Sequence, residues 1–174
     1  MSAPLVVVMG VSGSGKSTIG VLIADRLGIP FVDADSLHPI ENVTKMAAGT
    51  PLDDDDRWPW LQTVGRTFAE ATETGLVIAC SALKRVYREA ILAEAPGVEF
   101  VHLHGTHEVL SRRMEGRSGH FMPASLLDSQ LALLEELDAD EPGFVVDIDA
   151  PVDTIVDEAV AGIEAAEARS ASMG

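Results

Sequence analysis

A glycine-rich segment between an apolar run and a helical pattern constrains the fold of this chain more than any other feature. Its sequence is Gly10-Val11-Ser12-Gly13-Ser14-Gly15-Lys16-Ser17. This order of residues matches the G-x-x-x-x-G-K-[ST] pattern of a phosphate-binding loop. Residues 5–9 before it predict a buried strand, and residues 18–27 after it predict a helix. A simple turn would need neither the Lys-Ser pair nor this spacing, so we predict a phosphate site here.

Each residue type in this loop suits the phosphates of a nucleotide. Glycines let backbone N–H groups turn inward around phosphate oxygens, and the start of the following helix adds a favourable dipole. We predict that Lys16 is a catalytic cation at the β- and γ-phosphates, that Ser17 binds Mg²⁺, and that Thr18 completes the nucleotide-binding stretch. ATP and Mg²⁺ are therefore the expected cofactors. The loop alone does not separate a kinase from a nucleotide switch or an ATPase, because all of them grip phosphates.

Short apolar runs alternate with longer helix-like stretches along the chain. The runs that predict buried strands cover residues 5–9, 30–33, 76–80, 99–103 and 144–148. This alternation predicts an α/β P-loop NTPase fold, in which a mainly parallel five-stranded sheet is flanked by helices. A chain of 174 residues suits one core, so we predict a single domain over residues 1–168 and a tail over residues 169–174.

The charge of the chain limits its partners. Its formal net charge of −16 gives no long-range attraction for nucleic acid or for an anionic membrane, and neither is an expected partner. No apolar run approaches the roughly 20 residues of a membrane span. Cys80 is the only cysteine, which excludes an intrachain disulfide and fits a reducing, cytoplasmic setting. We predict a soluble protein in which each basic residue near the phosphate site matters.

Two carboxylates follow the second predicted strand, at the end where an open α/β sheet places its ligand crevice. They belong to Asp33 and Asp35, whose side chains would point to opposite sides of an extended segment. We assign Asp33 to the metal and Asp35 to the acceptor hydroxyl, as the catalytic base. Aspartate at a strand end is also a common turn former or helix cap, and this alternative stays open.

Further blocks of the sequence resemble those of bacterial gluconate kinases. The first group is Asp33-Ala34-Asp35-Ser36-Leu37-His38-Pro39, Asn42, Lys45-Met46, Gly49-Thr50-Pro51-Leu52, Asp54, Asp56-Arg57 and Pro59-Trp60-Leu61. The second group is Cys80-Ser81-Ala82-Leu83-Lys84, Tyr87-Arg88, Gly119-His120-Phe121-Met122 and Ser129-Gln130. The resemblance covers about residues 5–150 in collinear order. It implies a fold like that of nucleoside monophosphate kinases, with a mobile lid, and a relationship to shikimate kinase.

The resemblance implies that ATP phosphorylates the terminal (6-) hydroxyl of D-gluconate, in a homodimeric protein that serves gluconate utilisation. The closest alternative is a kinase of another small hydroxy acid, such as shikimate, and a nucleotide-binding switch protein is a more distant one. A gluconate pocket needs a cation for the carboxylate and several groups for the hydroxyls. The candidates for the carboxylate are Arg57, Lys84 and Arg88, and those for the hydroxyls are Asp35, His38 and Lys45.

A short stretch of arginines and small residues predicts a lid over residues 112–125 or so. Arginines delivered over the triphosphate stabilise charge on the group being transferred, and closure excludes water. We expect Arg117 to be the catalytic phosphate contact and Arg112 to stack on adenine near residues 149–151. An ordinary helix end, where arginine favours the dipole, is the alternative. His120 is a further candidate contact to substrate or nucleotide, with its role left open.

Several neighbouring residues have a structural interpretation that we prefer. The acidic run of residues 53–56 is expected to complement the start of a helix rather than to hold a cation. Trp58 and Trp60 are expected to anchor that helix in the core. Cys80 is expected to be a small buried residue.

Ser81, just beyond the third strand, is expected to lie near the γ-phosphate and to position a metal-bound water.

Overall fold

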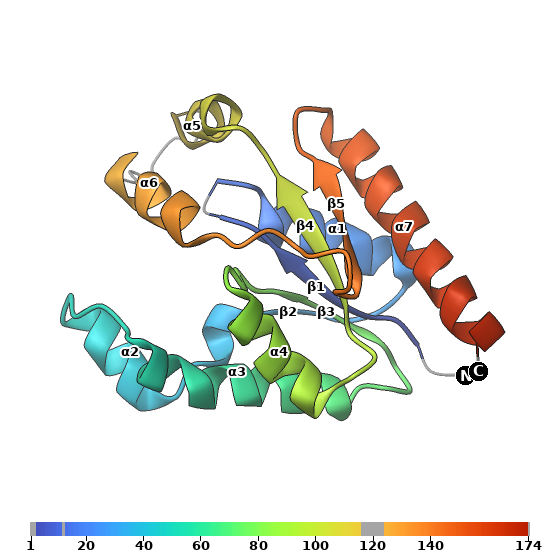
Figure 1. The fold of residues 1–174 in the computed structure, drawn as a ribbon, viewed down its shortest axis with the longest axis horizontal. Coiled ribbons are helices and arrows are strands. Elements are labelled where there is room, and N and C mark those ends of the chain that lie inside the picture. The colour runs from blue at the N-terminus through green and yellow to red at the C-terminus, as the bar shows by residue number, and fades with distance from the viewer. Residues whose placement is uncertain (1–2, 12, 116–123, 174) are drawn as a thin grey trace.

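The computed structural model describes residues 3–11, 13–115 and 124–173 (Figure 1). Strands and helices alternate along almost the whole of this part of the chain. In order, the elements are β1 (Leu5–Met9), α1 (Lys16–Leu27), β2 (Phe31–Asp33), the 3₁₀ helix η1 (Ala34–Leu37), α2 (Ile40–Ala47), α3 (Asp54–Ala69), β3 (Leu76–Ala79), α4 (Arg85–Glu94), β4 (Glu99–His104), α5 (His107–Glu115), α6 (Ala124–Leu133), β5 (Gly143–Asp147) and α7 (Val152–Met173). Among the described residues, no helix combines the length and the apolar character needed to cross a membrane.

One sheet of five parallel strands forms the centre of the molecule. Its strand order is β2-β3-β1-β4-β5, so β1 lies in the middle, with Val7 opposite Ile78 on one side and Phe100 on the other. The predicted α/β P-loop fold is confirmed, and each predicted strand is found within a residue or two of its expected bounds. Because all the strands run the same way, their carboxyl ends meet at one edge of the sheet.

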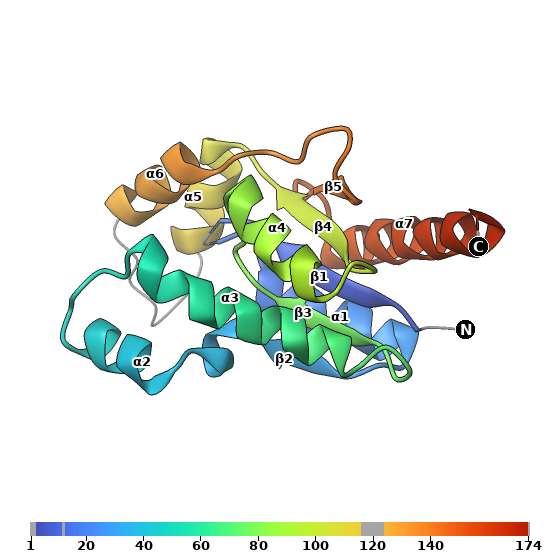
Figure 2. The same cartoon turned by 60° about the horizontal axis from the view of Figure 1, so that its bottom comes forward.

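Helices cover both faces of this sheet (Figures 1 and 2). The alternation of side chains along β1 explains the two layers, since successive residues of a strand point to opposite faces. Val6 and Val8 pack into a core with α1 and α7, whereas Val7 and Met9 pack into a second core with α3 and α4. Every residue of β1 is therefore buried, as in parallel sheets that helices cover on both sides.

Capping residues explain where several helices begin and end. Pro39 precedes α2, and Gly49, with φ of +78°, follows its end. Helix α3 begins at Asp54, because Asp53 and Asp56 form a reciprocal capping box at its start. The acidic run thus lies in the first turn of this helix, where we placed it. Helix α7 continues to Met173, past the predicted domain end at residue 168.

Helices α3 and α4 approach each other closely at Gly65. A Cβ atom at this position would lie 2.6 Å from the Cβ of Glu94 and 3.0 Å from the carbonyl oxygen of Ile91. Neither atom is the end of a flexible side chain, so both helices would have to move apart. The absence of a side chain at Gly65 therefore sets the distance between these two helices.

We expect Gly65→Ala to destabilise the protein although alanine is the better helix former. The clash should cost about 1 to 3 kcal/mol, more than the roughly 1 kcal/mol that alanine gains in a helix. Urea unfolding followed by circular dichroism measures the difference. Gly97→Ala is the control, because nothing lies within 4 Å of a Cβ atom there. Equal stability of Gly65→Ala and wild type would show that the helix pair adapts freely.

Candidate active site

The phosphate-binding loop has the backbone geometry that its glycines were predicted to provide. Gly13 and Gly15 have φ values of +86° and +88°, in the left-handed region that favours glycine. Gly15 is the cap residue of α1 and offers no side chain to the N–H groups of the first turn, which has no acidic residue either. These N–H groups and the helix dipole suit an anion. Lys16 donates from Nζ to the carbonyl oxygen of Val11 at 3.2 Å, along the same loop.

A buried hydroxyl supports the assignment of a ligand site to this loop. Ser14 is fully buried, and its Oγ has no hydrogen-bond partner among the described residues. A buried polar atom without a partner costs free energy unless a ligand or water supplies one. Gly10 packs against the same side chain, since a Cβ there would lie 2.7 Å from Ser14 Oγ. Ser12, another predicted loop contact, lies outside the described residues.

The carboxylate of Asp33 joins the loop to the second strand. Ser17 donates from Oγ to Asp33 Oδ2 at 3.0 Å, while Asp33 Oδ1 accepts from the backbone N–H of Asp35 at 3.0 Å. Asp33 therefore caps η1, which was the structural alternative, and also meets the hydroxyl predicted to bind a metal. A hydroxyl and a carboxylate oxygen are ligands that suit Mg²⁺.

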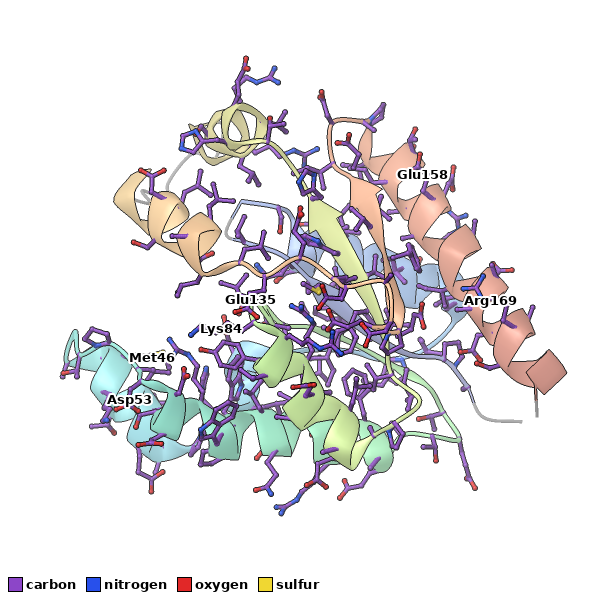
Figure 3. All side chains as sticks on the ribbon, viewed as in Figure 1. Met46, Asp53, Lys84, Glu135, Glu158 and Arg169 are labelled. Carbon is purple, nitrogen blue, oxygen red and sulfur yellow. The ribbon has the colours of Figure 1, made fainter. Side chains whose placement is uncertain are left out.

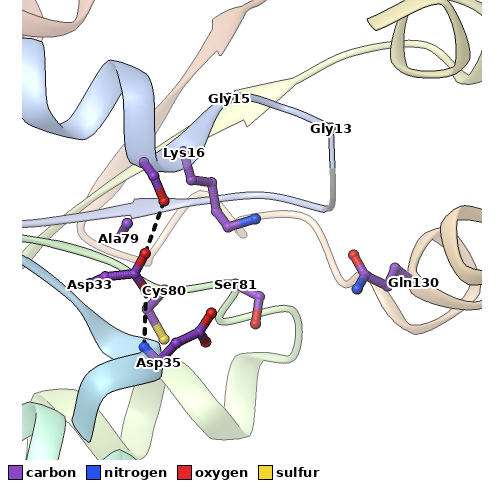
Figure 4. A pocket seen from close by; sticks show the side chains of 10 residues that line it. Gly13, Gly15, Lys16, Asp33, Asp35, Ala79, Cys80, Ser81 and Gln130 are labelled. Atoms are coloured by element: carbon purple, nitrogen blue, oxygen red, sulfur yellow. Dashed lines mark hydrogen bonds between the residues drawn. The ribbon is translucent and has the colours of Figure 1, made fainter. Parts of the chain in front are cut away.

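The two aspartates do not point to opposite sides of an extended segment, and that expectation is wrong. The chain leaves β2 at Asp33 and turns at once into η1, which contains Asp35. Both residues consequently line the same cleft, of about 320 Å³, together with Gly13, Gly15, Lys16, Ser17, Ala79, Cys80, Ser81 and Gln130. Figure 4 shows Lys16, Asp35 and Ser81 projecting towards a common space, with Gln130 facing them from α6.

Cys80 lines this cleft as a buried, unreactive side chain. Burial raises the pKa of its thiol to about 12, so the thiol stays protonated and is a poor nucleophile at neutral pH. Its exposure of 2% agrees with the small buried residue that we predicted. Ser81 follows it at the carboxyl end of β3 and lines the cleft.

His38 is held in one orientation beside the aspartates. Its ring stacks on Trp60 with a centroid distance of 4.2 Å, and its Nδ1 accepts from Asn42 Nδ2 at 3.1 Å. Because Nδ1 is an acceptor, the ring proton of the neutral imidazole lies on Nε2. Burial lowers the pKa of His38, against the opposing effect of Asp35. The neutral form, with one free donor, therefore predominates at neutral pH.

The acidic run supplies partners for the basic residues around it. Lys45 Nζ binds both carboxylate oxygens of Asp56, at 2.8 and 2.9 Å. Arg57 donates to Asp54 at 3.0 Å, and Tyr87 donates its hydroxyl to the same Asp54 oxygen at 2.5 Å. Lys45 and Arg57 thus remain close to the acceptor side, each already paired with a carboxylate.

The two tryptophans of α3 differ in their surroundings. Trp60 is buried, as predicted, and its Nε1 donates to the carbonyl oxygen of Ala34 at 2.8 Å. Trp58 is 38% exposed and contacts Tyr87 edge to face, so the expectation that it lies in the core is wrong. One residue separates them on the helix, which turns their side chains to different faces.

Arg88 is not available for a substrate carboxylate, and this is a correction. Its side chain is fully buried, and Nε and Nη2 bind the two carboxylate oxygens of Glu141 at 2.7 and 3.0 Å. Lys84, by contrast, precedes the first residue of α4, and its Nζ lies 5.7 Å from the ring centre of Tyr87. Figure 3 shows Lys84 leaving the start of α4 on the side where α2 and Met46 lie. Within the described ranges no carboxylate lies within ion-pair distance of this ammonium.

A second hollow lies beyond the phosphate-binding loop, where we expected adenine to bind. It is lined by Val109, Arg112, Arg113, Ile148, Asp149, Ala150 and Pro151. Arg113 donates to the carbonyl oxygen of Ile148, and its Nη1 lies 3.9 Å from the position that a Cβ of Gly15 would take. Arg113 therefore connects this hollow with the phosphate-binding loop. Arg117 and His120 lie outside the described residues.

The sequence interpretation missed two residues that line these hollows. Gln130 was noted only as part of a family block, and Arg113 was passed over in favour of its neighbours. Helix register could have identified Arg113, because it follows the buried Val109 and Leu110 by four and three residues and so shares their face. No comparable signal exists for Gln130, whose position depends on where α6 packs.

Comparisons with known proteins agree with this geometry. The family model described as shikimate kinase matches residues 12–157. A gluconokinase of Gluconobacter oxydans is 45% identical over 161 residues, which are 91% of this chain and 90% of that protein. The thermoresistant gluconokinase of Escherichia coli is 44% identical over 86% of this chain and 87% of its own length.

Solved structures give the same result. The crystal structure of a gluconokinase from Sinorhizobium meliloti 1021 superposes with a TM-score of 0.88, at 48% identity over 98% of both chains. A shikimate kinase from Aquifex aeolicus superposes with a TM-score of 0.57 at 19% identity over 92% of this chain and 96% of its own, a likeness that concerns the fold alone.

The only tyrosine of the chain allows a direct test of the cluster around Asp54. Burial and the hydrogen bond to Asp54 raise the pKa of Tyr87 to about 12, because both disfavour the phenolate. Ultraviolet difference titration should therefore show ionisation well above the ordinary pKa of about 10. Asp54→Asn should lower the titration midpoint, since it removes the negative charge. Ionisation near pH 10 in a chain that circular dichroism shows to be folded would contradict the cluster.

Proposed function

This chain belongs to the gluconokinase family of P-loop kinases, and we propose that it transfers the γ-phosphate of ATP to the 6-hydroxyl of D-gluconate, giving 6-phospho-D-gluconate and ADP. The observation that carries this proposal is the cleft in which Lys16 and Ser17 of the phosphate-binding loop face the carboxylate of Asp35. A grip on phosphates and a base for a hydroxyl are the two things that phosphoryl transfer to an alcohol requires.

The residues of the cleft suit the two halves of the reaction. The loop N–H groups and Lys16 hold the β- and γ-phosphates and balance the charge that develops on them. Asp35 accepts the proton of the 6-hydroxyl. At the same time the oxygen of this hydroxyl forms a bond to the γ-phosphorus, and the bond between the γ-phosphorus and the oxygen that bridges to the β-phosphate breaks, so that ADP leaves. Ser17 and Asp33 would hold Mg²⁺, which supplies charge neutralisation between the phosphates.

The acceptor side divides its work among charged and neutral groups. Lys84 is our choice for the gluconate carboxylate, because Arg88 is committed to Glu141 and Arg57 to Asp54. Neutral His38 has a proton on Nε2 for a hydroxyl, and the paired Lys45 adds a second donor. Arg57 and Lys84 each lie 5.7 Å from the ring centre of Tyr87, so Arg57 adds positive charge near Lys84.

The nucleotide base fits the hollow lined by Arg112 and Pro151. Guanidinium planes stack on aromatic rings, which supports our expectation for Arg112. Arg117 and His120 remain predicted contacts of a closing lid. A homodimer in the cytoplasm is also part of the proposal; it rests on the family resemblance and on the single buried cysteine.

A coupled assay of ADP release with a panel of sugar acids and hydroxy acids tests the proposed function. Gluconate should give turnover far above the background hydrolysis of ATP, and shikimate should not. Lys16→Ala should lose this turnover by several orders of magnitude, since positioning and electrostatics supply nearly all of the catalysis. Turnover with shikimate but not gluconate would assign the chain to the alternative. GTP preference with partner-dependent hydrolysis would indicate a switch protein.

Asp35→Asn separates the acceptor from the nucleotide side. The change keeps the shape of the residue but removes the base, so kcat should fall about 100- to 10,000-fold, the range of general base catalysis. The affinity for a non-hydrolysable ATP analogue, measured by titration calorimetry, should stay within about threefold, a change of less than one kcal/mol. A weaker nucleotide affinity with normal kcat would place Asp35 on the wrong ligand.

Lys84→Met tests the carboxylate contact. Loss of one charged hydrogen bond, of about 1.5 to 3 kcal/mol, should raise the KM for gluconate roughly 10- to 100-fold and leave the KM for ATP nearly unchanged. Arg85→Met is the matched control, because the neighbouring Arg85 pairs with Asp138 and Asp140 instead. Equal effects of the two changes on the KM for gluconate would remove Lys84 from the pocket.

A further inference from the structure

Arg88 and Glu141 form a fully enclosed ion pair that the proposed reaction does not use. The exposed fractions of their side chains are 0% and 4%, and the guanidinium binds both carboxylate oxygens. Glu141 also accepts from the backbone N–H of Asp138 at 2.8 Å. Burial alone would raise the pKa of Glu141, but the hydrogen bonds from Arg88 hold it below its usual range. The pair is therefore charged on both sides.

Such a pair is a poor device for stability alone. Removing two charges from water costs several kcal/mol per ion, and replacing a buried pair with apolar residues is often neutral or stabilising. The fixed fork of an arginine is, however, well suited to holding two partners at a set angle. Arg88 Nη2 also donates to the carbonyl oxygen of Glu136 at 3.5 Å, and a third contact of Arg88 shows what it holds besides Glu141 and Glu136.

That third contact is the backbone of the turn that follows β3. Arg88 Nη1 donates to the carbonyl oxygen of Ala82 at 2.9 Å. Ala82 has φ of +43°, which makes it the only non-glycine residue with positive φ in the described part of the chain. This conformation costs an alanine roughly 1 kcal/mol and persists only where surrounding contacts enforce it.

The turn at Ala82 connects residues that we have placed in the reaction. Ser81 lines the cleft, and its carbonyl oxygen accepts from the N–H of Gly10 at 3.4 Å. Lys84, two residues after Ala82, directly precedes α4. The carbonyl oxygen of Leu83, between them, accepts from the N–H of Glu135 at 2.7 Å, in the segment that leads from α6 to Glu141. Arg88 thus holds the turn from the buried side, through the carbonyl oxygen of Ala82.

We propose that the buried Arg88–Glu141 pair is a positioning device for this reaction, which fixes the left-handed turn at Ala82 and thereby sets the place of Ser81 in the cleft and of Lys84 at the start of α4. The inference rests on the proposed function for its effect on turnover. Arg88 and Glu141 touch neither substrate; they act through the carbonyl of Ala82 and through the segment of residues 134–141.

The neighbouring Arg85 provides a matched control. It lies on the same helix and pairs with Asp138 and Asp140 in the same segment, at 2.7 and 2.8 Å, but its side chain is 33% exposed and, among the described residues, makes no hydrogen bond to the carbonyl oxygen of Ala82. Arg85→Met therefore removes ion pairs to residues 138–140 while leaving the turn and its contact with Arg88 in place.

The experiment compares the double variant R88M/E141M with R85M. We expect R88M/E141M to fold, since it exchanges a buried pair for apolar side chains, and to lose kcat about 10- to 100-fold, as small displacements at a reacting site do. Binding of a non-hydrolysable ATP analogue should keep its stoichiometry and its affinity, while the KM for gluconate rises. R85M should keep kcat within about twofold, as expected for ion pairs that solvent reaches.

Hydrogen exchange gives a readout that needs no substrate. Amides of residues 80–88 should exchange faster in R88M/E141M and as slowly as wild type in R85M. If wild type did not phosphorylate gluconate, the proposed function would fail while this measurement still judged the positioning role. Unchanged exchange in the turn, or unchanged kcat and KM in a folded double variant, would overturn the inference.

Arg88→Lys covers the case in which the double variant does not fold. It keeps the charge opposite Glu141 but lacks the fork that also reaches Ala82. A fall in kcat with faster exchange in the turn and retained ATP-analogue binding supports the inference. Wild-type kcat in Arg88→Lys would show that only the charge is needed and would overturn it.

Discussion

The parallel pairing of β1 with β3 and β4 is the constraint on which the rest of the structure depends. It helps to bring the phosphate-binding loop, Asp33 at the end of β2, Asp35 in η1 and Ser81 after β3 to one edge of the sheet, although they are far apart in the sequence. Complete burial of β1 between two helical layers keeps this edge fixed. The hydrogen bond from Ser17 to Asp33 then connects the loop with a strand that is not its neighbour in the sheet. A cleft built in this way needs no flexible segment to assemble its floor.

The chain has a net charge of −16, and its few basic residues near the cleft differ in whether a carboxylate is paired with them. Lys16 and Arg113 lie at the phosphate-binding loop, and Lys84 lies at the acceptor side. Most of the remaining cations near the cleft are held by carboxylates at fixed distances, as in the pairs of Lys45 with Asp56 and Arg57 with Asp54. A carboxylate partner fixes a cation in place but weakens its attraction for an anionic ligand. Within the described residues no carboxylate lies within ion-pair distance of Lys84, which favours this ammonium as the proposed contact for the acid group of a substrate.

Features with a local physical cause, such as strands and the loop motif, could be predicted from the sequence. The direction in which a side chain points and the extent of its burial could not. Apolar runs predicted all five strands, and the loop motif predicted its own place between β1 and α1. The orientation of Asp35 was wrong because a 3₁₀ turn, which has no clear sequence signal, follows β2 directly. Arg88 was assigned to the substrate because of the family resemblance and its spacing of four residues from Lys84, which puts both on one helical face; only the distant Glu141 makes its burial possible. Trp58 and Trp60 look alike in the sequence, and only the packing of α3 distinguishes them.

Two side chains, one on α3 and one on α4, each donate a hydrogen bond to the backbone next to a residue that lines the cleft. Trp60 on α3 donates to the carbonyl oxygen of Ala34, which lies between Asp33 and Asp35. Arg88 on α4 donates to the carbonyl oxygen of Ala82, which follows Ser81. In both cases a side chain reaches from a helix to the backbone beside a cleft residue, where a small buried alanine allows the approach. Because α3 and α4 pack closely at Gly65, these two side chains share one rigid support. The spacing between Asp35 and the turn at Ser81 therefore depends on helix packing outside the cleft.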